Sequence, residues 1–292
     1  MKITTLFAAV LLLISCCTKT TTETTTPKKD ISLQLYSLRA DISTDYEGTL
    51  KKVGEMGFTS IEAASYDGEG KFYGKTPEEF KADLENVGLY ALSSHTNKSL
   101  SENELKTKDL SESLAWWDIC IAAHKAAGMK YIVAPSMPVP KTLADLQTYC
   151  EYYDIVGQKC KDSELSFGYH NHSFEFTEIE GQIMYDYMIE HTNPDLVFFQ
   201  MDVYWVVMGQ RSPVEYFQKY SGRFKHLHVK DKKELGQSGM VGFDAIFKNT
   251  DVAGVKELII EVESYNYAPE ESVKLSLDYL LNCSLVKENY ND

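Results

Sequence analysis

The sequence predicts a (β/α)8 TIM barrel folded as a single domain, and three observations lead to this prediction. Eight short apolar segments alternate with longer segments of helical periodicity over residues 30–292, and no change in composition marks a second domain. Polar residues gather at the ends of the predicted strands, where barrel enzymes place their functional groups. No glycine-rich phosphate loop follows any strand, which argues against the competing doubly wound open sheet.

The predicted strands are short runs rich in β-branched and aromatic residues, and most of them end in polar residues. In chain order they cover residues 31–37, 58–64, 89–95, 130–135, 165–172, 196–202, 224–231 and 257–263. Segments such as LVFFQMD are apolar on both alternating faces, as expected for strands of a parallel sheet that is covered on both sides.

The predicted helices separate these strands. They cover residues 77–87, 110–127, 141–162, 181–192, 212–221 and 269–282. Thr76 followed by Pro77 is a typical helix start. Glycines stand where helices should end and strands begin, at positions 57, 88, 128 and 254. Strands and helices therefore alternate along the chain, as a barrel requires.

The N-terminal residues predict export. Residues 1–15 carry Lys2 and an apolar run too short to span a membrane, which is typical of a signal peptide. The segment LISC resembles the lipobox of bacterial lipoproteins, in which Cys16 is acylated and becomes the new N-terminus; an ordinary cleaved signal is the alternative. Residues 16–29 are rich in threonine and predict a flexible tether. The residue after the lipidated position is Cys17 and not aspartate, and no acidic run follows. We therefore expect an exported lipoprotein on the periplasmic face of the outer membrane.

The amino-acid composition argues against some classes of binding partner. The formal charge is −14, from 29 basic and 43 acidic residues, which argues against nucleic acid and anionic lipid. We expect contact with a membrane only through the N-terminal lipid. The remaining cysteines match no zinc or redox spacing and predict small buried side chains: Cys120, Cys150, Cys160 and Cys283. The sequence is compatible with a monomer or a homodimer.

The strand ends carry acidic and imidazole groups in pairs two residues apart, which places each pair on one strand face. In chain order these groups are Glu62, His95, His170, His172, Asp202, His226, His228, Lys230, Glu261 and Glu263. A single pair of this kind could be two core histidines whose ring nitrogens are hydrogen-bonded within the protein. A cluster repeated on four strands is costly in a buried interior unless a divalent cation binds its oxygen and nitrogen atoms.

Several motifs resemble the xylose isomerase-like TIM barrel family, and more narrowly its sugar phosphate isomerase/epimerase-type proteins. They are QLYSLR (34–39), SSH (93–95), YHNHSFEF (169–176), MDVYW (201–205), HLHVKD (226–231) and IEVE (260–263). The resemblance covers the chain from about residue 31 onward and implies one divalent metal ion, such as Mn, Zn, Co or Mg.

The resemblance also implies which residues bind the metal. Asp202, His228 and Glu261 match three family ligands, and strand five should supply a glutamate. Glu175 is the nearest candidate, and His170 or His172 is the alternative. We predict that Glu175 completes the metal shell and that both histidines face the substrate.

The family's isomerases form an enediolate by proton transfer next to a carbonyl. On this resemblance we expect His170, His172 and Glu263 as acid/base groups, with Lys230 as a charge partner of an oxyanion. A surface lysine paired with Asp231 is the alternative for Lys230.

The expected substrate is a small carbohydrate. We expect Tyr36 and Trp205 to contact it through their aromatic faces, together with Glu62 and His95. Few arginines and no phosphate loop favour a free sugar or sugar derivative over a sugar phosphate. Trp205 stands where epimerases of the family often have a histidine, so a metal-dependent lyase or hydratase of 3-keto-glycosides is an alternative. A lipid-anchored sugar-binding protein without turnover is the non-enzymatic alternative.

Overall fold

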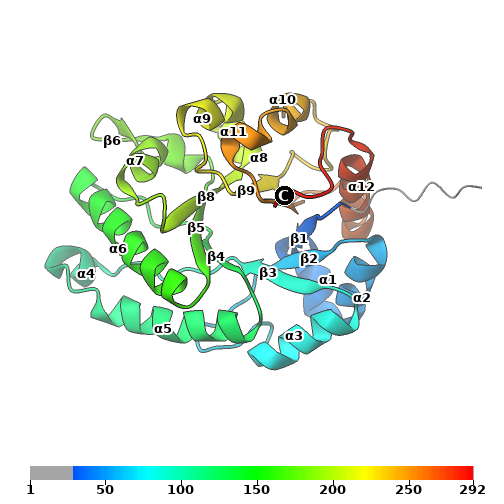
Figure 1. Ribbon diagram of the computed structural model, residues 1–292, viewed down its shortest axis with the longest axis horizontal. Coiled ribbons are helices and arrows are strands. Elements are labelled where there is room, and N and C mark those ends of the chain that lie inside the picture. The colour runs from blue at the N-terminus through cyan, green and yellow to red at the C-terminus, as the bar shows by residue number, and fades with distance from the viewer. Residues whose placement is uncertain (1–28, 292) are drawn as a thin grey trace, which may run out of the picture.

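The computed structural model describes residues 29–291, and in it eight parallel strands form a ring that is surrounded by helices (Figure 1). The strands are β1 (Ser32–Gln34), β2 (Ser60–Ala63), β3 (Tyr90–Ser94), β4 (Tyr131–Ala134), β5 (Ser166–His170), β8 (Val197–Asp202), β9 (His226–Val229) and β10 (Glu257–Ile260). Each lies within one of the predicted segments, so the predicted barrel is confirmed.

The ring is nearly closed. Neighbouring strands follow the order β3-β2-β1-β10-β9-β8-β5-β4. The two end strands meet through a parallel bridge between His95 and Val133, and the Thr96 N–H donates to the Val133 carbonyl at 2.9 Å. Closing the ring gives hydrogen-bond partners to backbone N–H and C=O groups of the two end strands, which would otherwise be exposed and unpaired.

The helices that the sequence predicts are present on the outside of the ring (Figure 1). They are α3 (Pro77–Asn86), α5 (Ser111–Ala126), α6 (Leu143–Asp162), α7 (Met184–His191), α9 (Pro213–Lys219) and α12 (Pro269–Asn282). Thr76 caps α3 through a hydrogen bond from the Glu79 N–H, and Glu79 bonds back to the Thr76 N–H. The helix start predicted from this stretch is therefore confirmed.

One predicted boundary is wrong. Helix α7 begins at Met184 and not at residue 181, because β6 (Glu178–Ile179) and β7 (Gln182–Ile183) form a small antiparallel hairpin. Glu180 and Gly181 at its turn have φ values of 50° and 81°. Two consecutive positive φ values suit a tight two-residue hairpin turn and are incompatible with a helix start.

Further short helices lie outside the predicted ranges. They are α1 (Arg39–Thr44), α2 (Tyr46–Met56), α4 (Glu102–Thr107), α8 (Val203–Met208), α10 (Phe243–Phe247) and α11 (Thr250–Ala253), with the 3-10 helices η1 (Leu35–Leu38) and η2 (Phe174–Phe176). Most are too short to be stable alone, so packing against the barrel, more than sequence pattern, determines them.

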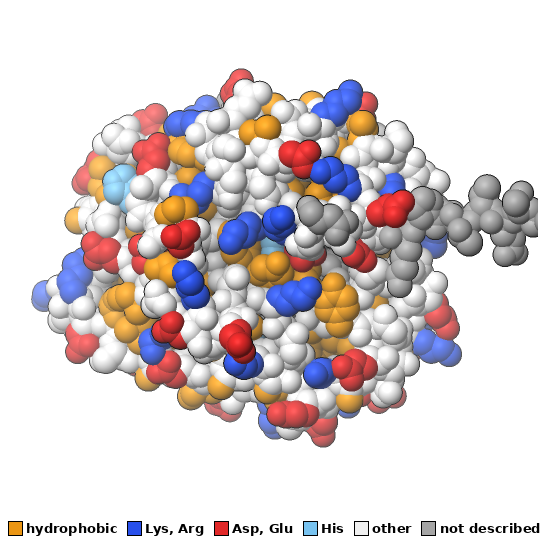
Figure 2. Space-filling view, in the orientation of Figure 1, with side chains coloured by type: hydrophobic (Ala, Val, Ile, Leu, Met, Phe, Trp, Pro, Cys, Tyr) orange, Lys and Arg blue, Asp and Glu red, His pale blue; other side chains and the backbone are white. Residues whose placement is uncertain are grey.

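Figure 1 views the barrel from the end where the strands begin. Asn291, near the C-terminus, donates to the Lys256 carbonyl just before β10 starts. Figure 2 shows this face, on which acidic and basic side chains are interspersed with apolar ones. The predicted site belongs to the opposite end of the barrel, where the strands stop.

Within residues 29–291, no helix is both long and apolar enough to cross a membrane. The predicted signal peptide, Cys16 and all but the last residue of the tether lie outside the described residues. Three of the four cysteines in the described part are buried, as predicted, and Cys283 is partly exposed.

Candidate active site

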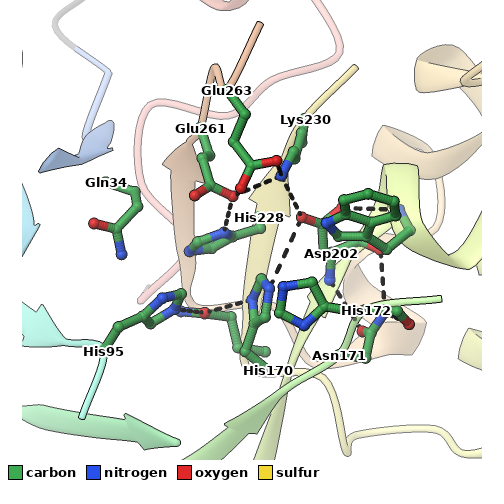
Figure 3. A network of polar contacts seen from close by, with 12 residues as sticks. Gln34, His95, His170, Asn171, His172, Asp202, His228, Lys230, Glu261 and Glu263 are labelled. Atoms are coloured by element: carbon green, nitrogen blue, oxygen red, sulfur yellow. Dashed lines mark hydrogen bonds and ion pairs between the residues drawn. The ribbon is translucent and has the colours of Figure 1, made fainter. Parts of the chain in front are cut away.

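Three side chains that could hold a metal ion, here called the ligand cluster, meet at the C-terminal ends of neighbouring strands (Figure 3). Asp202 ends β8, His228 lies on β9, and Glu261 directly follows β10. Strand register places Asp202 opposite His228, and one ligand atom from each of the three residues lies within 4.8 Å of the others. All three are buried. The convergence expected from their positions on successive strands is therefore present.

One carboxylate oxygen of Asp202 faces this cluster without a hydrogen bond from residues 29–291 and lies 3.9 Å from the Lys230 ammonium. Its Oδ1 accepts the Trp205 N–H at 3.0 Å and so caps helix α8, whereas its buried Oδ2 has no hydrogen-bond partner among the described residues. Burial raises the pKa of Asp202 to about 7; nearby Lys230 opposes this shift and Glu261 adds to it. A buried carboxylate oxygen without a donor is costly, and a cation would satisfy it.

His228 is oriented by carboxylates on both sides. Its Nε2 lies 2.6 Å from Glu62 Oε1, and its Nδ1 lies 3.3 Å from Glu261 Oε2. Burial alone would lower the pKa of His228, but Glu62 and Glu261 raise it to about 10. Histidine ligands of metals usually place their other ring nitrogen on a carboxylate or carbonyl. Glu62 is placed to serve this function, which leaves Nδ1 on the side of Glu261.

Glu62 lies beneath His228 and does not reach an open surface. Both its oxygens have protein donors, and the side chain is fully buried. The donors are Gln34 Nε2 at 2.9 Å, Ser93 Oγ at 2.6 Å and Gln200 Nε2 at 2.9 Å. His95 Nε2 also lies 3.0 Å from Glu62 Oε1. Although burial acts to raise the pKa of Glu62, His95 and His228 hold it well below its usual range. These contacts differ from the expected contact between Glu62 and substrate.

The tautomer of His170 follows from Gln200. Because Gln200 Nε2 donates to Glu62, its Oε1 accepts hydrogen bonds, and it lies 3.0 Å from His170 Nδ1 and 2.8 Å from His95 Nε2. His170 Nδ1 therefore carries the proton, and its Nε2 lone pair lies 4.0 Å from Asp202 Oδ2. Burial, then the nearby His228 and His95, holds the pKa of His170 well below its usual range, so the ring is neutral. The lone pair of His170 Nε2 is thus available to bind a metal ion beside the cluster.

His172 and Trp205 face each other above His170. Their rings are 5.7 Å apart, and the His172 and His170 rings are 5.0 Å apart. His172 Nδ1 and Trp205 Nε1 are both buried without a hydrogen-bond partner in the described part of the chain. Burial, then Lys230, lowers the pKa of His172 to about 4, so it is neutral near pH 7. Both side chains therefore offer unused polar atoms to a ligand.

Lys230 is buried inside the cluster. Its Nζ lies 2.7 Å from Glu263 Oε2, 3.1 Å from Glu261 Oε2 and 4.9 Å from the Trp205 ring centre. Burial opposes the charge, but Asp202, followed by Glu261 and Glu263, raises the pKa of Lys230 and keeps it protonated. Asp231 instead accepts hydrogen bonds from the backbone of the loop that directly follows it, at Lys232 and Gly236. The alternative of a surface lysine paired with Asp231 is therefore wrong.

The structure does not bring Glu175 to the ligand cluster, contrary to the prediction that it completes the metal shell. Its oxygens accept the Tyr169 hydroxyl and the His172 N–H, both at 2.8 Å. Tyr169 packs against Tyr153 of α6, outside the barrel interior. Burial raises the pKa of Glu175 to about 7. Helix η2 turns the chain directly after the strand, so this carboxylate supports the loop, and His170 occupies the interior position of β5.

Tyr36 and His95 lie at the rim. Tyr36 is 43% exposed on η1, and the His95 side chain retains 13% exposure.

Three residues belong to the site but were missing from the predicted set: Gln34, Ser93 and Gln200. Ser93 and Gln200 lie two residues before His95 and Asp202, so the alternation of strand faces already pointed to them.

Comparisons with known proteins agree with this architecture. The family model described as xylose isomerase-like TIM barrel matches residues 50–283. The crystal structure of a sugar phosphate isomerase/epimerase from Parabacteroides distasonis superposes with a TM-score of 0.82 at 31% identity, covering 90% of this chain and 97% of that chain. The crystal structure of the IOLI protein with a bound zinc atom shares the fold, with a TM-score of 0.63 and 13% identity over 90% of this chain and 100% of that chain.

Sequence similarity extends to inosose dehydratase from Geobacillus kaustophilus, which is 24% identical over 199 residues. The match spans 62% of this chain and 60% of that enzyme, which is less than two thirds of its length. The family model covers most of the described barrel, including the strands that carry Asp202 and His228. The chain therefore belongs to the xylose isomerase-like TIM barrel family.

Proposed function

We propose that this protein is a divalent-metal-dependent isomerase or epimerase that moves a proton next to the carbonyl of a free sugar or sugar derivative. The observation that carries the proposal is the convergence of Asp202, His228 and Glu261 within 4.8 Å in a buried site. His170 Nε2 is the fourth ligand on this proposal, in place of Glu175.

The chemistry of the donor set fits a divalent ion. Asp202, Glu261 and Glu263 gather around one ammonium group, so carboxylates outnumber the fixed cation. Mixed oxygen and imidazole nitrogen donors suit ions such as Mn²⁺, Co²⁺ or Zn²⁺, and the zinc in the IOLI protein supports this choice. A bound ion would act as a Lewis acid toward the carbonyl and hydroxyl oxygens of the sugar.

The chain's own residues supply the proton transfer. His172 is neutral and its Nδ1 is unpartnered, so this atom can accept a proton from the sugar carbon. Glu263, 31% exposed at its side chain, reaches the site from β10 as the second acid/base group. The Lys230 ammonium and the Trp205 N–H can donate to the oxygen on which charge develops.

A lyase or hydratase acting on a 3-keto-glycoside is the second candidate, and Trp205 favours it. The side chain three residues after Asp202 is an indole, which cannot act as a general base. A lyase needs one base, here His172, to remove the proton next to the carbonyl. It also needs one acid to protonate the group that leaves from the β-position. The similarity to an inosose dehydratase supports this candidate.

Deuterium exchange tests the proposal. Purified protein loaded with Mn²⁺ is incubated in D₂O with free sugars and with 3-keto sugars, and NMR follows the carbon next to the carbonyl. Exchange without loss of a group supports an isomerase or epimerase, and elimination of the β-substituent supports a lyase. Sugar binding without exchange at any carbon would favour the non-enzymatic alternative and refute both proposals.

A matched pair of variants identifies the proton-transfer group. His172→Ala should reduce exchange by roughly 100-fold or more, the usual contribution of a positioned acid/base group. His191→Ala is the control, because His191 is exposed at the end of α7, where it stacks on Tyr187. Equal exchange rates in these two variants would remove His172 from the mechanism.

A further inference from the structure

We infer that a cavity beside the active site binds the second ring of a glycoside whose first ring reacts at the cluster, an inference that rests on the proposed function. The cavity measures about 500 Å³ and lies where β1 and β2 end, among η1, α1 and the loop after β2. Its wall includes Tyr36, Arg39, Tyr46, Ser65 and Tyr73. The volume lies within the range of about 300–1,000 Å³ that is typical of small-molecule pockets.

Two short connections join the cavity to the active site. The Tyr36 N–H donates to Gln34 Oε1 at 3.0 Å, and the same Gln34 side chain donates to Glu62 below His228. Arg39 Nη2 donates to the Glu263 carbonyl at 3.2 Å, while the Glu263 carboxylate pairs with Lys230. Hydrogen bonds thus link the wall of the cavity to residues of the active site, and a ligand with two rings would extend from one to the other.

The cavity offers aromatic faces. Tyr36 is 43% exposed even though the Arg39 guanidinium lies 4.5 Å from its ring centre. The rings of Tyr46 and Tyr73 are 5.8 Å apart within the same wall. Flat rings with a polar tip suit the carbon-bound hydrogens of a pyranose face while leaving its hydroxyls free to hydrogen-bond.

The cavity also offers hydrogen-bond donors, most of them from Arg39. Arg39 uses three of its five N–H groups, on the Tyr36 carbonyl, the Tyr265 hydroxyl and the Glu263 carbonyl. In the described part of the chain its guanidinium is held by these neutral acceptors and by stacking on Tyr36 and Tyr265. Two N–H groups of Arg39 and the Ser65 hydroxyl therefore remain for the hydroxyls of a sugar ring.

Binding measurements with one-ring and two-ring sugars test the inference. Isothermal titration calorimetry compares methyl β-glucoside with cellobiose, and methyl α-glucoside with maltose, on the Mn²⁺-loaded protein. At least one disaccharide should bind roughly 2- to 10-fold more tightly than its one-ring reference, which is the effect expected of one stacked aromatic contact. Tyr36→Ala should bring this ratio close to one, and Arg39→Met, which keeps an apolar stem without N–H donors, should reduce it.

Tyr90→Ala is the matched control. Tyr90 is 40% exposed and has Lys130 over its ring at 5.6 Å, but it begins β3 at the opposite end of the barrel. The ratio should stay unchanged in this variant. Disaccharides that bind no tighter than the methyl glucosides, or not at all, would overturn the inference, as would an advantage that survives Tyr36→Ala. A disaccharide advantage without deuterium exchange on any sugar would instead refute the proposed catalytic function and leave the second-ring site in place.

Discussion

At the residue scale, the partner of one ring nitrogen decides what each histidine can do with the other. Gln200 accepts from His170 Nδ1, which frees Nε2 toward Asp202. Glu62 holds His228 Nε2, which leaves Nδ1 toward Glu261. Both orientations originate in the buried Glu62 carboxylate, because it also fixes the direction of the Gln200 amide. Such supporting contacts commonly change metal affinity by about 10–100-fold when they are removed.

The metal-ligand assignment on β5 is testable with two substitutions. Glu175→Gln should retain stoichiometric Mn²⁺ or Zn²⁺ after dialysis, because its carboxylate contacts Tyr169 and the His172 backbone and not the ligand cluster. His170→Ala should lose most of the metal, because it removes the Nε2 donor beside Asp202. Metal content is measured by plasma mass spectrometry. The reverse pattern would restore Glu175 as the ligand.

Metal affinity should rise with pH between about 6 and 8. In the metal-free protein the pKa of His228 is raised to about 10 and that of Asp202 to about 7, so at pH 7 the first is protonated and the second is partly protonated. A metal ion binds only the deprotonated groups, so lower pH weakens metal binding. Metal uptake should release one to two protons. The metal affinity should therefore change by roughly tenfold or more per pH unit. Calorimetry in buffers of different ionisation enthalpy counts these protons. An affinity that is flat over this range would contradict the assignment.

At the element scale, β5 and β8 shape the barrel interior beneath the cluster. Gly168 lies opposite Phe198 in the strand pairing, and the Phe198 ring packs 5.6 Å from Tyr131 and 4.5 Å from His226. A Cβ at position 168 would lie 2.5 Å from that ring. The glycine therefore makes room for an aromatic side chain in the layer beneath His170.

Gly168→Ala should destabilise the barrel by about 1–3 kcal/mol, the usual cost of overpacking a filled core. Phe198 cannot move aside easily because Tyr131 and His226 confine its ring. Urea unfolding followed by circular dichroism measures the change. Gly242→Ala is the control, because no atom lies within 4 Å of its added Cβ and its φ is −80°. Equal stability of the two variants would show that the barrel accommodates the added methyl group at position 168.

At the scale of the whole molecule, the closed ring brings distant parts of the chain to one end of the barrel. The proposed second-ring cavity lies at the ends of the first two strands and the ligand cluster at the ends of the last three, and they are neighbours because β1 pairs with β10. We also propose that the barrel is tethered to a membrane by a lipid on Cys16, with residues 16–29 as the spacer.

The tether is tested by Cys16→Ser in a bacterial host. The wild-type protein should partition into the detergent phase of a Triton X-114 extraction, and the variant should remain in the aqueous phase or accumulate unprocessed, because serine cannot receive the thioether-linked lipid. Cys283→Ser is the control, since that cysteine is a partly exposed residue of the barrel itself. Unchanged detergent partitioning of Cys16→Ser would refute the lipoprotein prediction.

The sequence by itself determined the eight strands and the residues that face the interior. Alternation along a strand is local, so the HxH, HxHxK and ExE patterns already assign His170, His228 and Glu261 to the inner face. The parallel order of β8, β9 and β10 then brings Asp202 to the same end. These predictions depended on neighbours only two residues apart.

Only the tertiary structure decided which interior groups are free to bind a ligand. Glu62 and His228 are 166 positions apart in the chain, and their contact depends on the closure of the ring. Glu175 is three residues from His172, yet the turn of η2 and the Tyr169 hydroxyl direct its carboxylate away from the cluster. Hydrogen bonds between distant strands and the direction of an irregular turn have no periodic signature, so the sequence pattern could not reveal them.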